Sequence, residues 1–340
     1  MKSLALFNNK GGVGKTTMTF NLGHMLARQG REVVLIDCDP QCNLSALALT
    51  EGELEEVFAS DASMGRTVAA CVERVRIGNG ELYKPALLEL AEHLSILPGD
   101  LTLSRFEGKL AKAWPEVFST DAESAVFVTT AIERLAEGLA IEHDVDVVLF
   151  DVGPSLGALN RAVLLACDAV LIPLAPDLFS LRGLENVGEA MRDWKDDWGQ
   201  ARIRIQQAQT RTAGRRRDGR GAPREHAMEP IGYVLQQHLA REEVPLKAYS
   251  RWAEQIPAYY RRFVLGQESE PAPGQAADPH CLGHLRHFAS LVPLAQAARK
   301  PIFDLKHADG VLGTQFQLVE RARAEFKALA QKVLQRLDAA

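Results

Sequence analysis

The chain has 340 residues, 46% hydrophobic and 24% charged, which is the balance of a globular protein with a substantial core. Its formal net charge of −5 excludes a globally basic nucleic-acid binder, so contact with nucleic acid would need a local basic patch. No run of about 18 apolar residues, no N-terminal leader and no cysteine framework are present, and this pattern predicts a cytoplasmic protein without membrane binding.

The N-terminal segment predicts a βαβ unit. Residues 4–7 form a short apolar strand before a glycine-rich turn, residues 16–28 have a helical pattern, and residues 32–37 form a second buried strand. Such units build parallel sheets with right-handed crossovers. The predicted fold class is therefore α/β.

The rest of the chain continues this alternation. Further strands are expected at 94–100, 146–153, 169–176 and 231–237, and helices at 122–142, 180–197 and 314–337, within a mostly helical last quarter. Two irregular stretches, at about 207–228 and 265–280, are rich in Gly with Arg or Pro and have no apolar period. Neither separates two cores, so we expect a single domain over residues 1–340 with two insertions.

The stretch NNKGGVGKTT lies between the first strand and the first helix, where a phosphate-binding loop is expected. Glycines let backbone N–H groups turn toward a phosphate, and the helix adds its positive N-terminal end. Lys15 would reach the β- and γ-phosphates and the Thr16 hydroxyl would bind Mg²⁺. Asn9 occupies the position of the usual first glycine, and beside it Lys10 could add a second cation, in its own subunit or in a facing one.

KGGVGKTT resembles the deviant Walker A motif of the ParA/MinD family of P-loop ATPases, which includes Soj. VVLIDCDPQCNLS at 33–45, LSILPGD at 94–100, residues 146–176 and residues 297–305 also resemble segments of that family. The similarity covers most of the chain outside the two insertions. It implies the P-loop NTPase fold, a mostly parallel, twisted sheet flanked by helices. With no helix-turn-helix region before the loop, the chain is most similar to the shorter ParA partition type.

The resemblance implies ATP and Mg²⁺ as cofactors and a homodimer in the ATP state. Lys10 would reach the partner's γ-phosphate, Asp39 would orient the attacking water, and Asp151 would hold Mg²⁺ with Thr16 and Asp39. The implied catalytic residues are Lys10, Lys15, Asp39 and Asp151. The implied phosphate contacts are Lys10, Gly11, Gly12, Val13, Gly14, Lys15, Thr16 and Thr17. Asp37 either supports the magnesium shell or caps the next turn.

Two further positions are open at this stage. Adenine contacts are expected from Gln236 or Gln237, although both are equally consistent with an exposed polar strand end. Gly153 replaces the first proline of the family's usual Asp-x-Pro-Pro sequence. This replacement should loosen the segment after Asp151 and affect hydrolysis more than nucleotide binding.

The first insertion contains six arginines that could attract a phosphate backbone without reading sequence. They are Arg211, Arg215, Arg216, Arg217, Arg220 and Arg224. A solvated insertion without a partner is the alternative. If the cluster binds DNA, the protein would be associated with the nucleoid.

Three other patterns have simple structural explanations. His280, His284 and His287 have helical spacing and predict a polar helix face rather than a zinc site. Trp194 and Trp198, one helical turn apart, predict packing rather than nucleotide stacking. The apolar stripe of residues 323–340 fits a helix packed on a sheet better than a membrane-surface helix.

The predicted function is that of a ParA-like ATPase that acts in plasmid or chromosome partition or in cargo positioning. Its ATP-bound dimer would bind non-specific DNA, and a ParB-like or cargo protein would stimulate slow hydrolysis. The alternative is a nucleotide-gated adaptor that controls a neighbouring effector protein without binding DNA.

Overall fold

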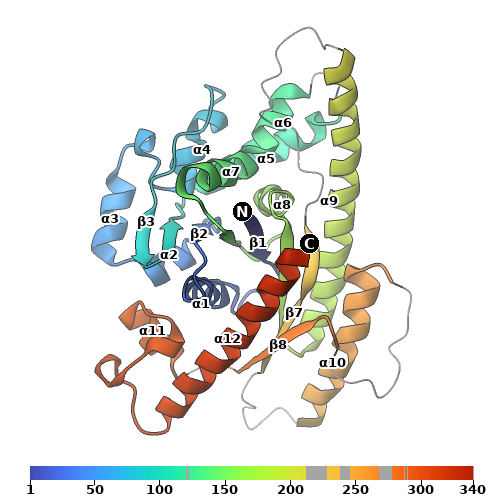
Figure 1. The fold of residues 1–340 in the computed structure, drawn as a ribbon. Helices are drawn as coiled ribbons and strands as arrows, with labels where there is room; N and C mark the ends of the chain where they lie inside the picture. The colour runs from blue at the N-terminus through green and yellow to red at the C-terminus, as the bar shows by residue number, and fades with distance from the viewer. Residues whose placement is uncertain are drawn as a thin grey trace.

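The computed structural model describes residues 1–119, 122–211, 228–237, 246–267, 278–286, 288 and 290–339. Among these residues, eight strands form one sheet in the order β3-β4-β2-β5-β1-β6-β7-β8 (Figure 1). The strands are β1 (Lys2–Leu6), β2 (Val33–Asp37), β3 (Leu88–Ala91), β4 (Leu94–Leu97), β5 (Val147–Asp151), β6 (Ala169–Leu174), β7 (Glu229–Gln237) and β8 (Cys281–Arg286). Neighbouring strands are parallel except at the edge, where β3 pairs antiparallel with β4.

Helices cover both faces of this sheet. They are α1 (Lys15–Ala27), α2 (Asn43–Ala48), α3 (Glu51–Ala59), α4 (Val68–Arg76), α5 (Leu103–Glu116), α6 (Glu123–Thr129), α7 (Ala131–His143), α8 (Ala158–Leu165), α9 (Leu178–Arg211), α10 (Leu246–Tyr259), α11 (Val292–Ala298) and α12 (Gln315–Ala339). The described residues also form the short segments η1 (Ala62–Met64), the π-helical η2 (Tyr260–Val264), η3 (Ile302–Asp304) and η4 (His307–Asp309).

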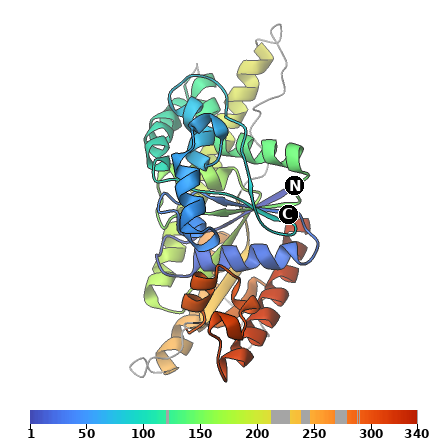
Figure 2. The ribbon, with the colours of Figure 1, turned by 90° about the vertical axis from the view of Figure 1, so that its left-hand side faces the viewer.

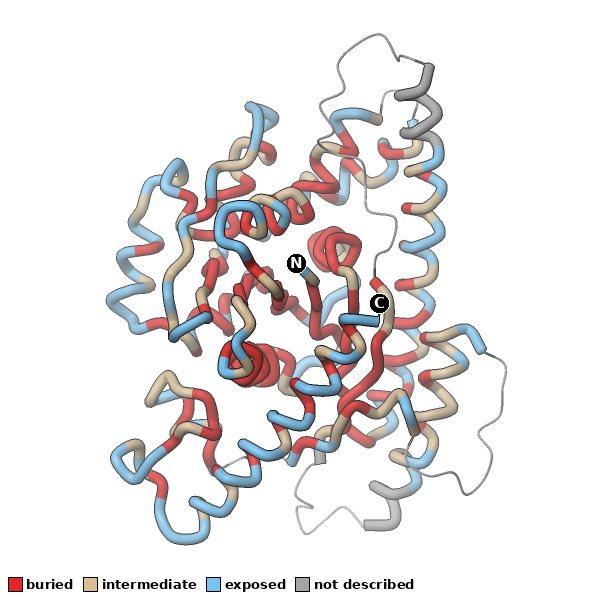
Figure 3. The backbone as a smooth tube through the Cα atoms, viewed as in Figure 1, coloured by how far each residue is buried: buried red, intermediate tan, exposed pale blue. Residues whose placement is uncertain are grey.

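The core has two layers because successive side chains of a strand point to opposite faces. Leu4 and Leu6 pack with residues of α1 and α12, whereas Ala5 packs with residues of α5, α7 and α8. Figure 2 shows these two helical layers on opposite sides of the sheet. Buried on both faces, the central strands consist of continuous apolar runs, and Figure 3 shows them as the buried centre of the molecule.

Most of the elements predicted from the sequence are present, with two differences of extent. The helix expected at 180–197 is α9, which extends to Arg211, and the helix expected at 122–142 is divided at Thr130 into α6 and α7. The last helix is packed as expected, because Phe326, Leu329 and Val333 of its apolar stripe are buried. Within the described residues, no helix combines the length and the apolar character needed to cross a bilayer.

The expectation of a helix around His280 and His284 is wrong. His284 lies in β8, and His280 precedes that strand, while His287 lies outside the described residues. The helical face that the spacing implied is therefore absent, because His280 lies in the turn before β8 and His284 lies within the strand. In the described part of the chain, no group of three or more His, Cys, Asp or Glu side chains is arranged to hold a metal by itself.

Most residues of the two predicted insertions, 212–227 and 268–277, are not among those that the structure describes. The single-domain organisation therefore stays a prediction for the chain as a whole. What positions the functional site is the register of the central strands. Asp37, at the end of β2, lies beside Asp151 at the end of β5, and Asp151 pairs with Leu6 at the end of β1.

Candidate functional site

The glycine loop leaves β1 at this edge of the sheet and ends at the first turn of α1. Gly12 and Gly14 have φ values of 74° and 68°, a left-handed conformation that glycine adopts at little cost. Met18 N–H donates to the Gly14 carbonyl at 2.8 Å and begins the helical hydrogen bonding. The N-terminus of α1 therefore faces the loop, as a phosphate site requires.

Lys15 spans the inside of the loop. Its Nζ donates to the carbonyl oxygens of Asn8 at 3.0 Å and Lys10 at 3.1 Å, and the side chain is buried. Burial lowers the pKa of Lys15, while the charges of Asp151 and Asp39 act in the opposite direction. An ammonium group is thus held at the centre of the loop, where its hydrogen-bond acceptors among the described residues are carbonyl oxygens.

The side chains of Thr16 and Asp151 meet beside this ammonium group. Thr16 Oγ1 donates to Asp151 Oδ2 at 2.8 Å, and the buried Asp151 Oδ1 has no hydrogen-bond partner among the described residues. Burial, with the nearby charges of Asp37 and Asp39, raises the pKa of Asp151 well above its usual range. A buried carboxylate with one unpartnered oxygen and a neighbouring hydroxyl fits Mg²⁺, which completes its shell with phosphate oxygens and water.

Asp37 has a structural role in this geometry. Its Oδ2 accepts hydrogen bonds from Ser45 N at 2.8 Å and Ser45 Oγ at 2.6 Å, and Ser45 Oγ accepts from Gly99 N at 2.8 Å. Burial raises the pKa of Asp37 to about 6, although the hydrogen bonds from Ser45 act to lower this pKa. Of the two roles considered, capping of the following turn matches these contacts. Asp37 therefore joins the β2 end, α2 and the segment after β4.

Asp39 lies two residues beyond the end of β2 and is buried at the same edge of the sheet. Gln41 N donates to Asp39 Oδ1 at 3.0 Å, which holds the carboxylate in place. A Cβ added at Gly153 would lie 3.2 Å from Asp39 Oδ1, so glycine leaves room for this carboxylate. Asn160 Nδ2 donates to the carbonyl oxygens of Gly153 and Ser155, both at 2.7 Å, and holds the segment after Asp151 in place.

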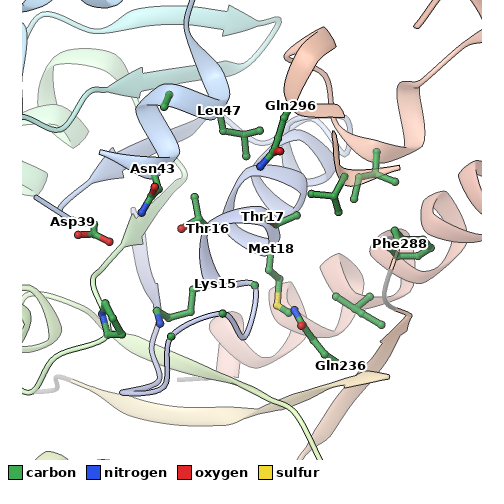
Figure 4. A pocket seen from close by; sticks show the side chains of 18 of the residues that line it. Lys15, Thr16, Thr17, Met18, Asp39, Asn43, Leu47, Gln236, Phe288 and Gln296 are labelled. Carbon is green, nitrogen blue, oxygen red and sulfur yellow. The ribbon is translucent and has the colours of Figure 1, made fainter. Parts of the chain in front are cut away.

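A cleft of about 850 Å³ opens from the loop toward the ends of β7 and β8 (Figure 4). Lys15, Thr16 and Asp39 line one part, and Gln236, Phe288 and Gln296 line another. Further apolar lining comes from Leu47, Leu285, Val292, Pro293, Ile302 and Phe326. The cleft thus joins a polar phosphate-binding end to a largely apolar end that has two amide side chains.

Among the predicted residues, those that line the cleft are Gly11, Gly12, Gly14, Lys15, Thr16, Thr17, Asp39 and Gln236. Asp151 lies beside it through its hydrogen bond with Thr16, whereas Lys10 pairs with Asp177 and the Val13 side chain is buried. A Cβ at Gly14 would overlap the Gln236 amide, so the end of β7 lies directly against the loop. The side chains of Gln237 and Arg211 lie outside the described structure, as do Arg215, Arg216, Arg217, Arg220 and Arg224.

Several residues of the site were missed by sequence reasoning. Ser45, Asn160, Phe288 and Gln296 have no recognisable spacing relative to the glycine loop. Ser45, within the second-strand motif, and Asn160, within residues 146–176, lay in segments already singled out, but neither was assigned a role there. Asn160 reaches the site from α8, and Phe288 and Gln296 reach it from the chain after β8.

A strand, a glycine loop and a helix, with Lys15, Thr16 and Asp151 in these positions, define a P-loop nucleotide-binding protein. A family model described as an AAA domain matches residues 1–205. The chain belongs to the ParA/MinD/Soj family of P-loop ATPases.

Two named relatives share about a third of their aligned residues with this chain. The sporulation initiation inhibitor protein Soj of Bacillus subtilis is 30% identical over 192 residues, 56% of this chain and 65% of Soj. The chromosome partitioning protein ParA of Caulobacter vibrioides is 32% identical over 185 residues, 54% of this chain and 60% of ParA. The matched region thus spans less than two thirds of either relative.

Solved structures show the same fold over nearly the whole chain. Protein DIP2308 of Corynebacterium diphtheriae has a TM-score of 0.72 at 24% identity and covers 99% of both chains. A plasmid partition protein of Borrelia burgdorferi, described as putative and bound to AMPPNP, has a TM-score of 0.60 at 16% identity, covering 98% of this chain and 99% of its own. Both likenesses concern the fold alone.

Proposed function

We propose that this protein is an ATP- and Mg²⁺-dependent switch that forms a homodimer in its ATP state and hydrolyses ATP slowly. The observation that carries the proposal is the presence of two cations at one phosphate loop. Lys15 is buried inside the loop, whereas the Lys10 side chain is 28% exposed at its rim. A rim ammonium that does not bond the carbonyls of its own loop, as Lys15 does, is suited to a phosphate held by a second subunit.

Different residues of the chain have separate roles in phosphoryl transfer, a reaction that depends mainly on positioning and charge neutralisation. The N–H groups of residues 11–17 and the Lys15 ammonium hold the β- and γ-phosphates. Thr16 and Asp151, with Asp39 nearby, would hold Mg²⁺, which would neutralise charge on the phosphate oxygens. Asp39 accepts a hydrogen bond from the attacking water and orients it toward the γ-phosphorus.

The apolar end of the cleft is proposed to hold the adenine base. Gln236 and Gln296 each offer an amide donor and acceptor, and Phe288 and Pro293 offer apolar surface. This assignment refines the expectation for the end of β7 by adding Gln296, which lies on α11. Gln237 remains a second candidate from the same strand.

We propose partition of a plasmid or chromosome, or positioning of another cargo, as the role of the switch. The names of the Soj and ParA relatives support this role. Non-specific DNA would contact the arginine cluster of residues 211–224, and a ParB-like or cargo protein would stimulate turnover. Replacing those six arginines with alanine should weaken ATP-dependent binding to random DNA. Unchanged binding would remove the cluster from the proposal.

Light scattering of the nucleotide-free protein and of samples with ADP, ATP, and ATP plus DNA tests the proposal. We expect a dimer mass only with ATP, and a larger complex when DNA is added. Lys10→Ala should bind ATP yet stay monomeric, whereas Lys327→Ala, which removes an exposed lysine from α12, should behave as wild type. A dimeric Lys10→Ala protein would refute the role of Lys10 across the dimer. ATP-dependent dimers whose mass does not increase when DNA is added would favour the adaptor function.

A further inference from the structure

Lys10 is held by a residue far along its own chain. Its ammonium group forms an ion pair with Asp177 Oδ2, directly before α9. The other carboxylate oxygen, Asp177 Oδ1, accepts a hydrogen bond from Ser180 N at 2.9 Å and caps the start of the helix. One carboxylate thus joins the rim of the phosphate loop to the N-terminus of a 34-residue helix.

Neighbouring contacts hold the same half of the loop against this region. Asn8 Nδ2 donates to the Pro173 carbonyl at 2.7 Å, and Asn8 Oδ1 accepts from Lys10 N at 2.9 Å. Asn9 Oδ1 lies only 2.9 Å from the position that a Cβ at Gly183 would occupy. The loop before Gly11 therefore rests on the end of β6 and the first turns of α9, and this support positions Lys10 for the ion pair.

We infer that Asp177 is a positioning residue that retains Lys10 on its own subunit until ATP is bound, and that breaking this ion pair is a step in dimer assembly. The inference rests on the proposed function. An ammonium group paired with Asp177 has part of its charge neutralised and one of its three N–H donors engaged, so the ion pair weakens its attraction for a phosphate across a dimer. The retained state therefore competes with the dimer, and its population lowers the apparent affinity between subunits.

The exposure of the pair indicates how strong the retention is. The Lys10 and Asp177 side chains are 28% and 37% exposed, so solvent screens their attraction. Pairs of this kind shift an equilibrium by about two- to fivefold. The adjoining Leu178 and Phe179 are 45% and 73% exposed, so a second subunit has open access to this edge. Asp177 thus acts as a weak latch that phosphate binding can overcome.

The latch can be separated from helix capping by the choice of substitution. Asp177→Asn removes the charge but keeps an oxygen that accepts from Ser180 N, so the cap and the melting temperature should be preserved. Asp177→Glu keeps the charge and is the conservative rescue. Asp177→Ala removes both functions and measures the cost of the lost cap.

The first measurement needs no nucleotide. The full-length protein is treated with a short pulse of acetylating reagent, and modification of Lys10 is quantified by mass spectrometry against Lys327. Because the amine must leave the carboxylate to react, Asp177→Asn should raise the Lys10 rate by about two- to fivefold. Asp177→Glu should restore the slow rate. An unchanged Lys10 rate in Asp177→Asn would overturn the latch.

The second measurement is an ATP titration followed by light scattering. Asp177→Asn should dimerise at about two- to fivefold lower ATP concentration than wild type. In the Lys10→Ala background, which should stay monomeric with ATP, the same substitution should not restore a dimer, because the ammonium on which Asp177 acts is gone. An unchanged ATP requirement in Asp177→Asn would overturn the latch while leaving the dimer itself intact. A wild-type protein that stays monomeric with ATP would overturn the proposed function and, with it, this role of Asp177.

Discussion

Replacing His24 should remove a large part of this protein's sensitivity to mild acid. His24 lies on α1, the helix that begins with Lys15, and is only 8% exposed. Its ring meets Phe20 edge-on at 4.6 Å, and its Nε2 has no hydrogen-bond partner in the described structure. Burial lowers the pKa of His24 from 6.5 to about 4, although the negative charge of Asp304 acts to raise this pKa.

The size of the effect follows from this pKa. The folded protein keeps the imidazole neutral between about pH 4 and 6.5, a range in which the unfolded chain binds the proton. The stability that depends on the neutral ring is therefore fully present above pH 6.5 and is lost as the pH falls toward 4. At about 1.4 kcal/mol per tenfold change in proton affinity, the loss approaches about 3 kcal/mol.

Urea unfolding between pH 4.5 and 7.5, followed by tryptophan fluorescence, measures this loss. The free energy of unfolding of His24→Leu should fall less steeply with acid than that of wild type, because titrating groups common to both proteins cancel in the comparison. His143→Leu, at the exposed end of α7, is the matched control and should follow the wild-type curve. If the His24→Leu and wild-type curves were parallel, the buried neutral imidazole would not be the cause.

Three further predictions concern the site. Asp39→Ala should keep ATP binding and dimerisation while losing at least about 100-fold in phosphate release, and monomers with ATP would contradict it. Gly153→Ala should slow phosphate release with little change in ATP affinity, because the added Cβ would lie 3.2 Å from Asp39 Oδ1 and displace that carboxylate. A wild-type rate of phosphate release would show that the carboxylate has room to move. Ser45→Ala should lower the free energy of unfolding, measured in urea, by about 1–3 kcal/mol, because Asp37 and Gly99 each lose a buried hydrogen bond to the Ser45 hydroxyl. An unchanged free energy would mean that other groups form hydrogen bonds to Asp37 and Gly99.

Local patterns were sufficient for much of the fold. The central strands are buried on both faces, so each is a continuous apolar run that can be recognised without knowing its neighbours. The left-handed positions in the glycine loop are occupied by Gly12 and Gly14, residues that suit them. Asp151 ends one parallel strand and Asp39 lies two residues beyond the end of its neighbour, and the carboxyl ends of such strands meet at one edge of the sheet.

Edge strand β8 shows where local pattern fails. Its burial alternates only partly, and the spacing of His280 and His284 matched a helix as well as a strand. Pairing with β7 decides between them, because that strand satisfies the backbone groups on the facing side of residues 281–286. The hydrophobic periodicity of β8 does not show that it pairs with β7, and that of β7 does not show that it pairs with β8.

By itself, the sequence determined a phosphate loop with an additional lysine, two acids at strand ends and an alternating α/β chain, because each depends on neighbours a few residues away. Only the tertiary structure decided what these groups contact. Asp177 meets Lys10 across 167 positions of sequence, and Gln296 lines the same cleft as Lys15 although it lies on α11. Contacts of this kind arise from packing helices on both faces of one sheet, which brings distant segments together in a way that no local spacing encodes.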